Sequence, residues 1–299
     1  MKKKSKFILF ICCIVAILVL ICGFIIKKTS INKGKKVSTE ATQVSNDNTT
    51  QPTKETIAKK EEKAKNKFDG IKLTASDIGI PVLCYHDVTP NNPDNNDMLL
   101  NPNKFKEQLK WLKENGYTSI TLTDLYNHLR NNESIPEKPV VLTFDDGYRG
   151  NFTYAYPILN EMGFTANFFV ISDFVDNGLY MTKDELKELV INGFEVDSHT
   201  SRHLDLSKLN YNQQVETFKT SREALEKIIN KPVNFVAYPY GKYNAETRNA
   251  AETAGYKLGF NLCGNLADRN DNNYNMDRLY VSNNYSLEHF ANKIKNATK

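Results

Sequence analysis

One stretch decides the fold: Val140-Val141-Leu142-Thr143-Phe144-Asp145-Asp146-Gly147-Tyr148. Its apolar, β-branched beginning predicts a buried strand, and Gly147 predicts a turn directly after it. Two adjacent carboxylates, Asp145 and Asp146, stand at the carboxyl end of this strand, where α/β proteins keep their chemistry. Adjacent acids repel each other unless a positive group lies beside them, which favours a bound cation. The alternative is a turn in which the acids only cap the backbone, and the stretch by itself favours neither.

Segments of strand and helix character alternate from about residue 68 to the C-terminus. Apolar runs such as 81–86 and 233–237 predict strands. Segments such as 103–115 and 211–230 predict amphipathic helices. About eight such units in one domain predict an α/β protein with a distorted (β/α) barrel, which is irregular or not fully closed.

A second polar cluster follows a later predicted strand, Asp197-Ser198-His199-Thr200-Ser201-Arg202-His203. Two histidines four residues apart meet on one side of a helical turn, a spacing typical of metal ligands. In a β/α barrel the carboxyl ends of the strands meet at one face, so His199 and His203 should lie near Asp145 and Asp146. The two clusters together favour a metal site over a simple turn.

Thr143-Phe144-Asp145-Asp146-Gly147-Tyr148 and Ser198-His199-Thr200-x-x-His203 together resemble the motifs of the NodB-like polysaccharide deacetylases, carbohydrate esterase family four. The resemblance extends over about residues 78–285. It implies a distorted (β/α) barrel and an enzyme that releases acetate from a polysaccharide containing N-acetylglucosamine. Poly-N-acetylglucosamine and peptidoglycan are the two polymers that we expect.

The same resemblance assigns roles at the site. It implies that Asp146, His199 and His203 hold one divalent metal ion, with Zn²⁺ expected and Co²⁺, Ni²⁺ or Fe²⁺ as alternatives. It implies that Asp145 is the catalytic base. These assignments make Asp145 and the metal ligands the residues on which hydrolysis depends.

The chain departs from the family pattern at the third motif, Ala237-Tyr238-Pro239-Tyr240-Gly241. That motif often begins with arginine, and Ala237 stands there instead. We expect Arg278 to take over the orientation of Asp145. From the resemblance, Pro239 and Tyr240 form the substrate and oxyanion side of the site, with the Tyr240 backbone N–H as the donor to the oxyanion.

The start of the folded part, Val82-Leu83-Cys84-Tyr85-His86-Asp87-Val88, resembles the branch of the family that includes the intercellular-adhesin and poly-N-acetylglucosamine deacetylases. The resemblance implies that His86 is the general acid; a core histidine bonded to a backbone carbonyl is the alternative. Tyr148 and Tyr240 are expected to stack on sugar rings, with core packing as the alternative for Tyr148.

The N-terminus predicts a membrane anchor. Four lysines precede an uncharged apolar run, Phe7 to Ile26, whose 20 residues would span roughly 30 Å as a helix. We divide the chain into an anchor (1–28), a polar linker (29–67) and a catalytic domain (68–299). The positive-inside rule favours a single-pass protein of the cell membrane with the catalytic domain outside.

Charge and cysteine content narrow the classes further. Residues 1–67 hold 15 lysines and 5 acidic residues, which gives a charge of +10. Because the whole chain has a net charge of +4, the remaining residues carry 4 − 10 = −6. This argues against nucleic acid as a partner of the folded part. Cys84 and Cys263 are expected to be buried free thiols.

Two other functions remain open. A glycoside hydrolase needs two carboxylates roughly 5–9 Å apart, which adjacent acids on one strand end fit poorly. A non-catalytic glycan-binding protein on the same fold is the second, and the missing arginine at Ala237 keeps it open. Acetate release separates both from a deacetylase.

Overall fold

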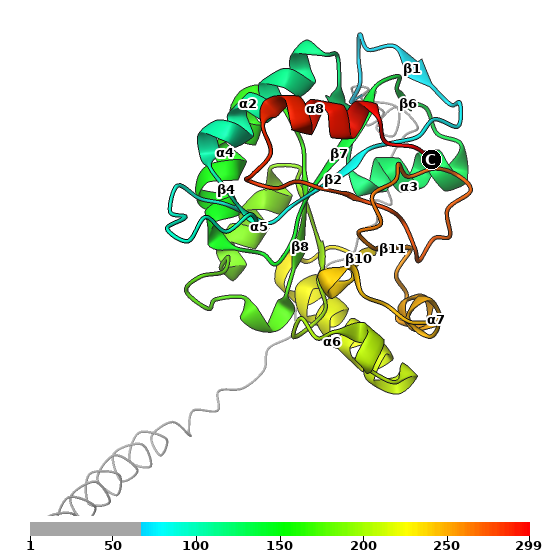
Figure 1. The fold of residues 1–299 in the computed structure, drawn as a ribbon. Helices are drawn as coiled ribbons and strands as arrows, with labels where there is room; N and C mark the ends of the chain where they lie inside the picture. The colour runs from blue at the N-terminus through cyan, green and yellow to red at the C-terminus, as the bar shows by residue number, and fades with distance from the viewer. Residues whose placement is uncertain (1–66) are drawn as a thin grey trace, which may run out of the picture. The chain divides into compact units, whose positions relative to one another are not determined.

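Strand β7 (Pro139–Phe144) lies within a curled parallel sheet in the computed structural model, which describes residues 67–299 (Figure 1). All residues of β7 are buried, as expected for an apolar strand covered on both faces. The strand order is β11, β10, β9, β8, β7, β2 and β12, with β5 beside β7. The other strands of this sheet are β2 (Val82–Tyr85), β5 (Thr118–Ser119), β8 (Asn167–Val170), β9 (Glu195–Ser198), β10 (Phe235–Ala237), β11 (Leu258–Phe260) and β12 (Leu279–Tyr280).

Residues 276–280 connect the two ends of this curled sheet. Met276 makes a parallel bridge to Phe260 of β11. Three residues later, at Leu279, β12 begins and pairs in parallel with β2. The sheet therefore fits the expected distorted (β/α) barrel, completed on one side by a short and irregular segment.

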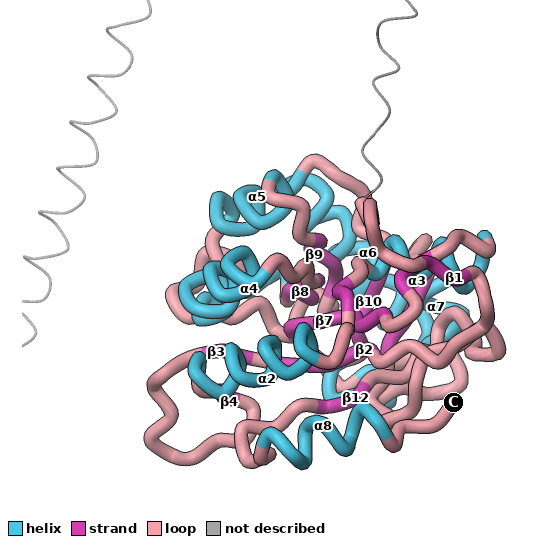
Figure 2. The backbone as a smooth tube through the Cα atoms, turned by 90° about the horizontal axis from the view of Figure 1, so that it is seen from above, coloured by secondary structure: helices cyan, strands magenta, loops and turns pink. Residues whose placement is uncertain are grey.

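Helices surround the sheet, and Figure 2 shows α2, α4 and α5 along one side of the strands. Helix α2 packs against α4 and α8, and α5 packs against α6. Within residues 67–299, three helices begin with a capping box, at Thr121, Thr182 and Asn210, in which side chains and backbone satisfy each other's hydrogen bonds. The helices are α2 (Pro102–Glu114), α3 (Leu122–Asn131), α4 (Tyr156–Met162), α5 (Lys183–Ile191), α6 (Tyr211–Ile229), α7 (Thr247–Thr253) and α8 (Leu287–Lys295).

Two small pairs of strands lie outside this sheet. Strand β1 (Leu73–Thr74) is antiparallel to β6 (Ile135–Pro136), and β3 (Asp87–Val88) is parallel to β4 (Leu99–Leu100). His86, the residue expected to be the general acid, lies between the end of β2 in the main sheet and the start of β3.

The two faces of each strand belong to different apolar clusters. Leu142 and Phe144 of β7 pack in the cluster that contains the outer helices. Val141 belongs to the second cluster, with Phe169, Phe260 and other residues of the inner face. Because side chains alternate along a strand, the positions that continue the Val141 face are 143 and 145. The inner face of β7 therefore leads directly to the first carboxylate of the pair.

The predicted anchor and nearly all of the predicted linker lie outside the described residues. Within residues 67–299, no helix is both long enough and apolar enough to cross a membrane. The prediction that both cysteines are buried is wrong for one of them. Cys84 is buried, but Cys263 is exposed, because it lies in the irregular segment that follows β11.

Candidate active site and metal centre

Asp145 lies at the carboxyl end of β7, buried and turned toward the inside of the sheet. Its backbone N–H donates to the Tyr85 carbonyl at 2.9 Å, which continues the pairing of β7 with β2. Its two carboxylate oxygens accept hydrogen bonds from the two terminal nitrogens of Arg278, each at 2.7 Å. The structure thus brings Arg278 to the carboxylate that it was expected to orient.

Arg278 is fully buried immediately before β12, and each of its three side-chain nitrogens donates at least one hydrogen bond. Its Nε donates to the Asn261 carbonyl at 3.1 Å, and Nη1 also donates to Thr143 Oγ1 at 3.1 Å. Its guanidinium carbon lies 5.3 Å from the centre of the Phe169 ring. These contacts leave the planar group one orientation, the one that holds Asp145 in a bidentate pair.

This pairing decides the charge of both groups. Burial alone would raise the pKa of Asp145, but the charge and the hydrogen bonds of Arg278 outweigh burial, so the pKa is held well below its usual range. Burial also opposes the charge on Arg278, and Asp145 overcomes it, so the pKa of Arg278 is raised. Asp145 is therefore ionised at neutral pH, which is the protonation state that a general base needs before the reaction.

Asp146 faces two imidazoles. Its Oδ1 lies 3.4 Å from His199 Nε2 and 3.3 Å from His203 Nε2. One donor atom from each of the three residues lies within 4.8 Å of the others. Asp146 Oδ1 is buried and has no hydrogen-bond partner among the described residues.

The protonation state of His199 indicates that this donor set suits a cation. Its Nδ1 lies 2.9 Å from the Ala237 carbonyl, which can only accept, so Nδ1 carries the proton. Burial lowers the pKa of His199 to about 3, so the ring is neutral and Nε2 presents a lone pair. That lone pair faces the Asp146 carboxylate. Two electron-rich atoms at this distance repel unless a proton or a cation lies between them, and burial beside Asp145 raises the pKa of Asp146 to about 7. The three converging donors, with Asp146 Oδ1 lacking a hydrogen-bond partner among the described residues, fit a divalent metal ion.

The two histidines meet by a route that the sequence did not predict. The expected helical turn over 199–203 is wrong: these residues form an irregular loop after β9. Thr200 and His203 have φ of 65° and 56°, and the two imidazole rings lie 4.9 Å apart. The left-handed backbone, and not helical spacing, turns both rings toward Asp146.

Asp146 itself has φ of 71°, and Gly147 follows with φ of 81°. A side chain at position 147 would meet Val170 at 3.1 Å, so both backbone angle and space favour glycine there. The reversal turns Asp146 away from the alternation of β7. Adjacent acids therefore face different partners, Asp145 toward Arg278 and Asp146 toward the histidines.

His86 follows β2 and lies beside Asp145. One of its ring nitrogens, a carboxylate oxygen of Asp145 and the Cys84 sulfur lie within 4.8 Å of one another. Its ring contacts Tyr280 edge to face at 5.6 Å, and its Nδ1 is buried without a partner among the described residues. The alternative of a histidine bonded to a backbone carbonyl receives no support at Nδ1. Burial lowers the pKa of His86, and the Asp145 charge opposes that shift.

The tyrosines differ in exposure. Tyr240, in the turn Pro239–Gly241, is 60% exposed with φ of 60°, and its ring lies 4.5 Å from the His203 ring. Tyr148 is half-buried and stacks on Tyr180 with ring centres 5.1 Å apart. Tyr240 therefore lies exposed beside the donor set, whereas one face of Tyr148 is already covered.

Several supporting residues were not predicted. Cys84 Sγ lies 3.4 Å from Asp145 Oδ2, and Asn151 holds the backbone around His86 through the His86 carbonyl at 2.7 Å and the Val88 N–H at 3.1 Å. The sequence could have indicated that Cys84 lies near the site, since it stands two residues before His86. Nothing in the local sequence indicates the role of Asn151, because it reaches β3 from a segment 63 residues away.

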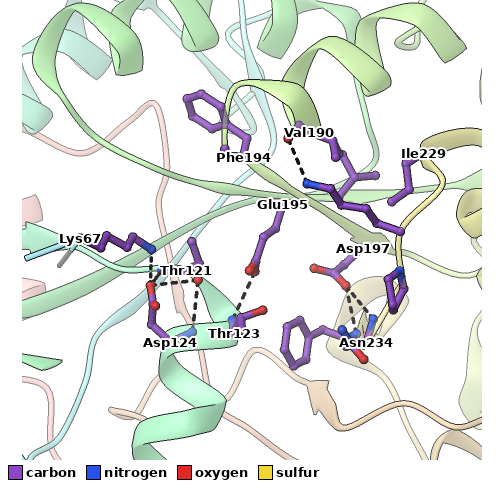
Figure 3. Close-up of a pocket in the computed structure, with 15 residues that line it drawn as sticks. Lys67, Thr121, Thr123, Asp124, Val190, Phe194, Glu195, Asp197, Ile229 and Asn234 are labelled. Atoms are coloured by element: carbon purple, nitrogen blue, oxygen red, sulfur yellow. Dashed lines mark hydrogen bonds and ion pairs between the residues drawn. The ribbon is translucent and has the colours of Figure 1, made fainter. Parts of the chain in front are cut away.

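A pocket of about 430 Å³ lies away from these residues, at the amino ends of β9 and β10 (Figure 3). Glu195 accepts a hydrogen bond from the Thr123 N–H, and Asp197 accepts from the Asn234 and Phe235 N–H groups. These acids fix the ends of strands. In barrels this end serves stability, and the chemistry lies at the opposite face.

Comparisons with known proteins agree with this geometry. Residues 132–259 match the family model of polysaccharide deacetylase. YxkH of Bacillus subtilis, named as a polysaccharide deacetylase, is 32% identical over 203 residues, 68% of this chain and 71% of that protein. Poly-beta-1,6-N-acetyl-D-glucosamine N-deacetylase of Staphylococcus aureus is 28% identical over 64% of this chain and 70% of its own. The structure of Streptococcus pyogenes deacetylase PplD in complex with acetate has 30% identity and a TM-score of 0.69, covering 73% of this chain and 99% of that one.

The donor set generates a first prediction. His203→Ala should weaken metal binding by more than about 100-fold, since even changes around ligands cost about 10- to 100-fold. Metal content of the purified chain, measured by mass spectrometry, checks it. His289→Ala is the matched control, because His289 is exposed on α8. Equal metal content in both variants would contradict the assignment.

The ion pair generates a second prediction. Arg278→Ala leaves Asp145 buried without its partner, so we expect about 3–5 kcal/mol lower unfolding free energy in urea. Adding Ala237→Arg should recover part of this loss, because Ala237 faces the same inner cluster as the Phe169 ring beneath Arg278. Arg278→Lys keeps the positive charge but loses the bidentate donor geometry of the guanidinium. Its unfolding free energy should therefore lie between those of the parent and of Arg278→Ala. An unchanged unfolding midpoint in Arg278→Ala would refute the dependence.

Proposed function

The chain belongs to the polysaccharide deacetylase family, and from this premise we propose that it is a metal-dependent hydrolase of an extracellular polymer of N-acetylglucosamine. As a polysaccharide N-deacetylase, it releases acetate and leaves glucosamine units. The observation that carries the proposal is the opposite orientation of two adjacent acids, Asp145 toward Arg278 and Asp146 toward two imidazoles. In that arrangement two consecutive residues have different roles, Asp145 as the proton acceptor and Asp146 as a metal ligand.

Asp146, His199 and His203 would hold the ion, and a divalent ion there supplies Lewis acidity and makes water a better nucleophile. Asp145 accepts the proton of the attacking water, because Arg278 keeps its carboxylate ionised and fixed. The water oxygen forms a bond to the acetyl carbon. The Tyr240 backbone N–H donates to the acetyl oxygen as negative charge develops there.

His86 protonates the amine nitrogen when the C–N bond breaks. Burial favours the neutral ring in the resting chain, so the ring receives its proton during the cycle. Asp145 carries the proton taken from water and lies within 4.8 Å of a His86 ring nitrogen. The products are acetate and a free amine, and both proton-transfer groups return to their starting states.

Substrate and location belong to the same proposal. The Staphylococcus aureus relative is named for poly-beta-1,6-N-acetyl-D-glucosamine, which supports that polymer, with peptidoglycan as the alternative. The exposed ring of Tyr240 suits stacking on a sugar. The apolar run Phe7 to Ile26 and its flanking lysines support an anchor in the cell membrane with residues 68–299 outside.

The non-catalytic alternative depended on the missing arginine at position 237. Arg278 makes the bidentate contact with Asp145 from a different strand end. That observation removes the reason to favour a protein that only binds glycan.

Acetate release tests the proposal directly. The purified chain, supplied with Zn²⁺, should release acetate from poly-N-acetylglucosamine, and a parallel assay on peptidoglycan identifies the preferred polymer. Asp145→Asn is the control, because it keeps the shape and loses the proton acceptor. New reducing ends without acetate would favour a glycoside hydrolase, and binding without either product would favour a glycan-binding protein.

The assignment of His86 predicts a dependence on the leaving group. At one equivalent of Zn²⁺ per chain, His86→Ala should lower kcat on the amide by about 10²- to 10⁴-fold and leave the metal content unchanged. The loss should be smaller on an acetylated phenol, whose leaving group needs no proton, whereas Asp145→Asn should reduce both rates. Equal losses on both substrates in His86→Ala would mean that His86 is not the acid.

The proposed topology predicts where protease cuts. Protease added to intact wall-stripped cells should release a fragment that starts within about residues 29–67, since polar linkers are cut first. N-terminal sequencing of the released fragment locates the cut. A fragment that stays protected until the membrane is opened would reverse the proposed orientation.

A further inference from the structure

Next to the Asp146 site lies a second set of donors, and we propose that it binds a thiophilic divalent cation that inhibits the enzyme. The set consists of the Cys84 thiol, the His86 ring and the Asp145 carboxylate. One donor atom from each lies within 4.8 Å of the other two. The inhibitory effect rests on the proposed function, whereas the binding does not.

The three donors converge because of strand geometry. Cys84 follows Val82 on the inner face of β2, and His86 continues the same alternation. Asp145 stands at the equivalent end of β7, which pairs with β2 from Val82 to Tyr85. Cys84 Sγ lies 3.4 Å from Asp145 Oδ2, and His86 Nδ1 is buried without a partner among the described residues.

The chemistry of the donors selects the class of cation. Thiolate, imidazole and carboxylate together suit Zn²⁺ and softer ions such as Cd²⁺, and three ligands leave a position open. Mg²⁺ prefers oxygen ligands and gains little from sulfur. The set therefore favours Cd²⁺, or Zn²⁺ in excess of the first site.

Arg278 sets how tightly this cation binds. Its Nη2 donates to Asp145 Oδ2 at 2.7 Å, but a carboxylate oxygen has a further lone pair for an ion. On binding, the Cys84 S–H bond breaks, a sulfur–metal bond forms and the proton leaves to solvent, with no change of oxidation state. The positive charge of Arg278 repels the incoming cation, and Arg278 already occupies acceptor positions of Asp145, so this site binds more weakly than the Asp146 site.

Occupation would stop turnover without disturbing the fold. Asp145 and His86 are the two groups proposed to accept and deliver the proton. A cation bound to both takes the lone pairs that those transfers need. We therefore expect metal to activate at one equivalent per chain and to inhibit beyond it.

The test uses the full chain, loaded with one equivalent of Zn²⁺ and titrated with Cd²⁺. Bound cadmium, the ultraviolet absorption of the cadmium–thiolate bond and acetate release are followed together. Cys84→Ala and Cys84→Ser should each lose one equivalent of bound cadmium relative to the parent. The Cd²⁺ concentration for half-inhibition of each variant's own rate should rise more than about tenfold.

Cys263→Ala is the matched control, since its thiol is exposed and distant in sequence from the set; it should keep the parent's inhibition. Thiols elsewhere in the chain contribute equally to parent and variants. Inhibition of Cys84→Ser at the parent's Cd²⁺ concentration, with equal bound cadmium, would overturn the proposal. Cadmium binding that depends on Cys84 in a chain that never releases acetate would support the cation site and count against the deacetylase function.

Discussion

The buried pair of Arg278 and Asp145 is the interaction on which the site depends. A guanidinium and a carboxylate without solvent are stable only when both are fully bonded, and here Asn261 and Thr143 complete the set. The pair joins β12 to β7 across the inside of the sheet. It thus fixes the strand that completes the barrel and the carboxylate that accepts a proton, so structure and chemistry share one contact.

Left-handed backbone is the second constraint. Asp146, His203 and Tyr240 all have positive φ, which costs energy for residues other than glycine and is retained where packing enforces it. Each of these residues leaves its strand or loop direction at this point. As a result, three segments that would otherwise point their side chains apart direct them to one place, and the Asp146 carboxylate faces two imidazole rings.

Asp145 lies between two donor sets of different character. On one side are Asp146 and its histidines, with nitrogen and oxygen donors; on the other are Cys84 and His86, with sulfur and nitrogen. The second set arises from the alternation of side chains at the ends of neighbouring parallel strands. The first set depends instead on left-handed backbone at Asp146 and His203. A barrel that brings catalytic groups together in this way also brings together donors that a soft cation can occupy.

Local sequence alone determined the central strand and the two polar clusters, because these depend on periodicity and on neighbours a few residues apart. It also determined that Asp145, Asp146, His199 and His203 share one face, since the carboxyl ends of parallel strands meet. The departure from the family motif suggested Arg278 as the residue that orients Asp145, but only the tertiary structure shows the bidentate contact between these residues, which are 133 positions apart. Only the tertiary structure decided that a left-handed loop rather than a helical turn joins the histidines. Those outcomes depend on packing between segments distant in the chain, and no local pattern of residues encodes such contacts.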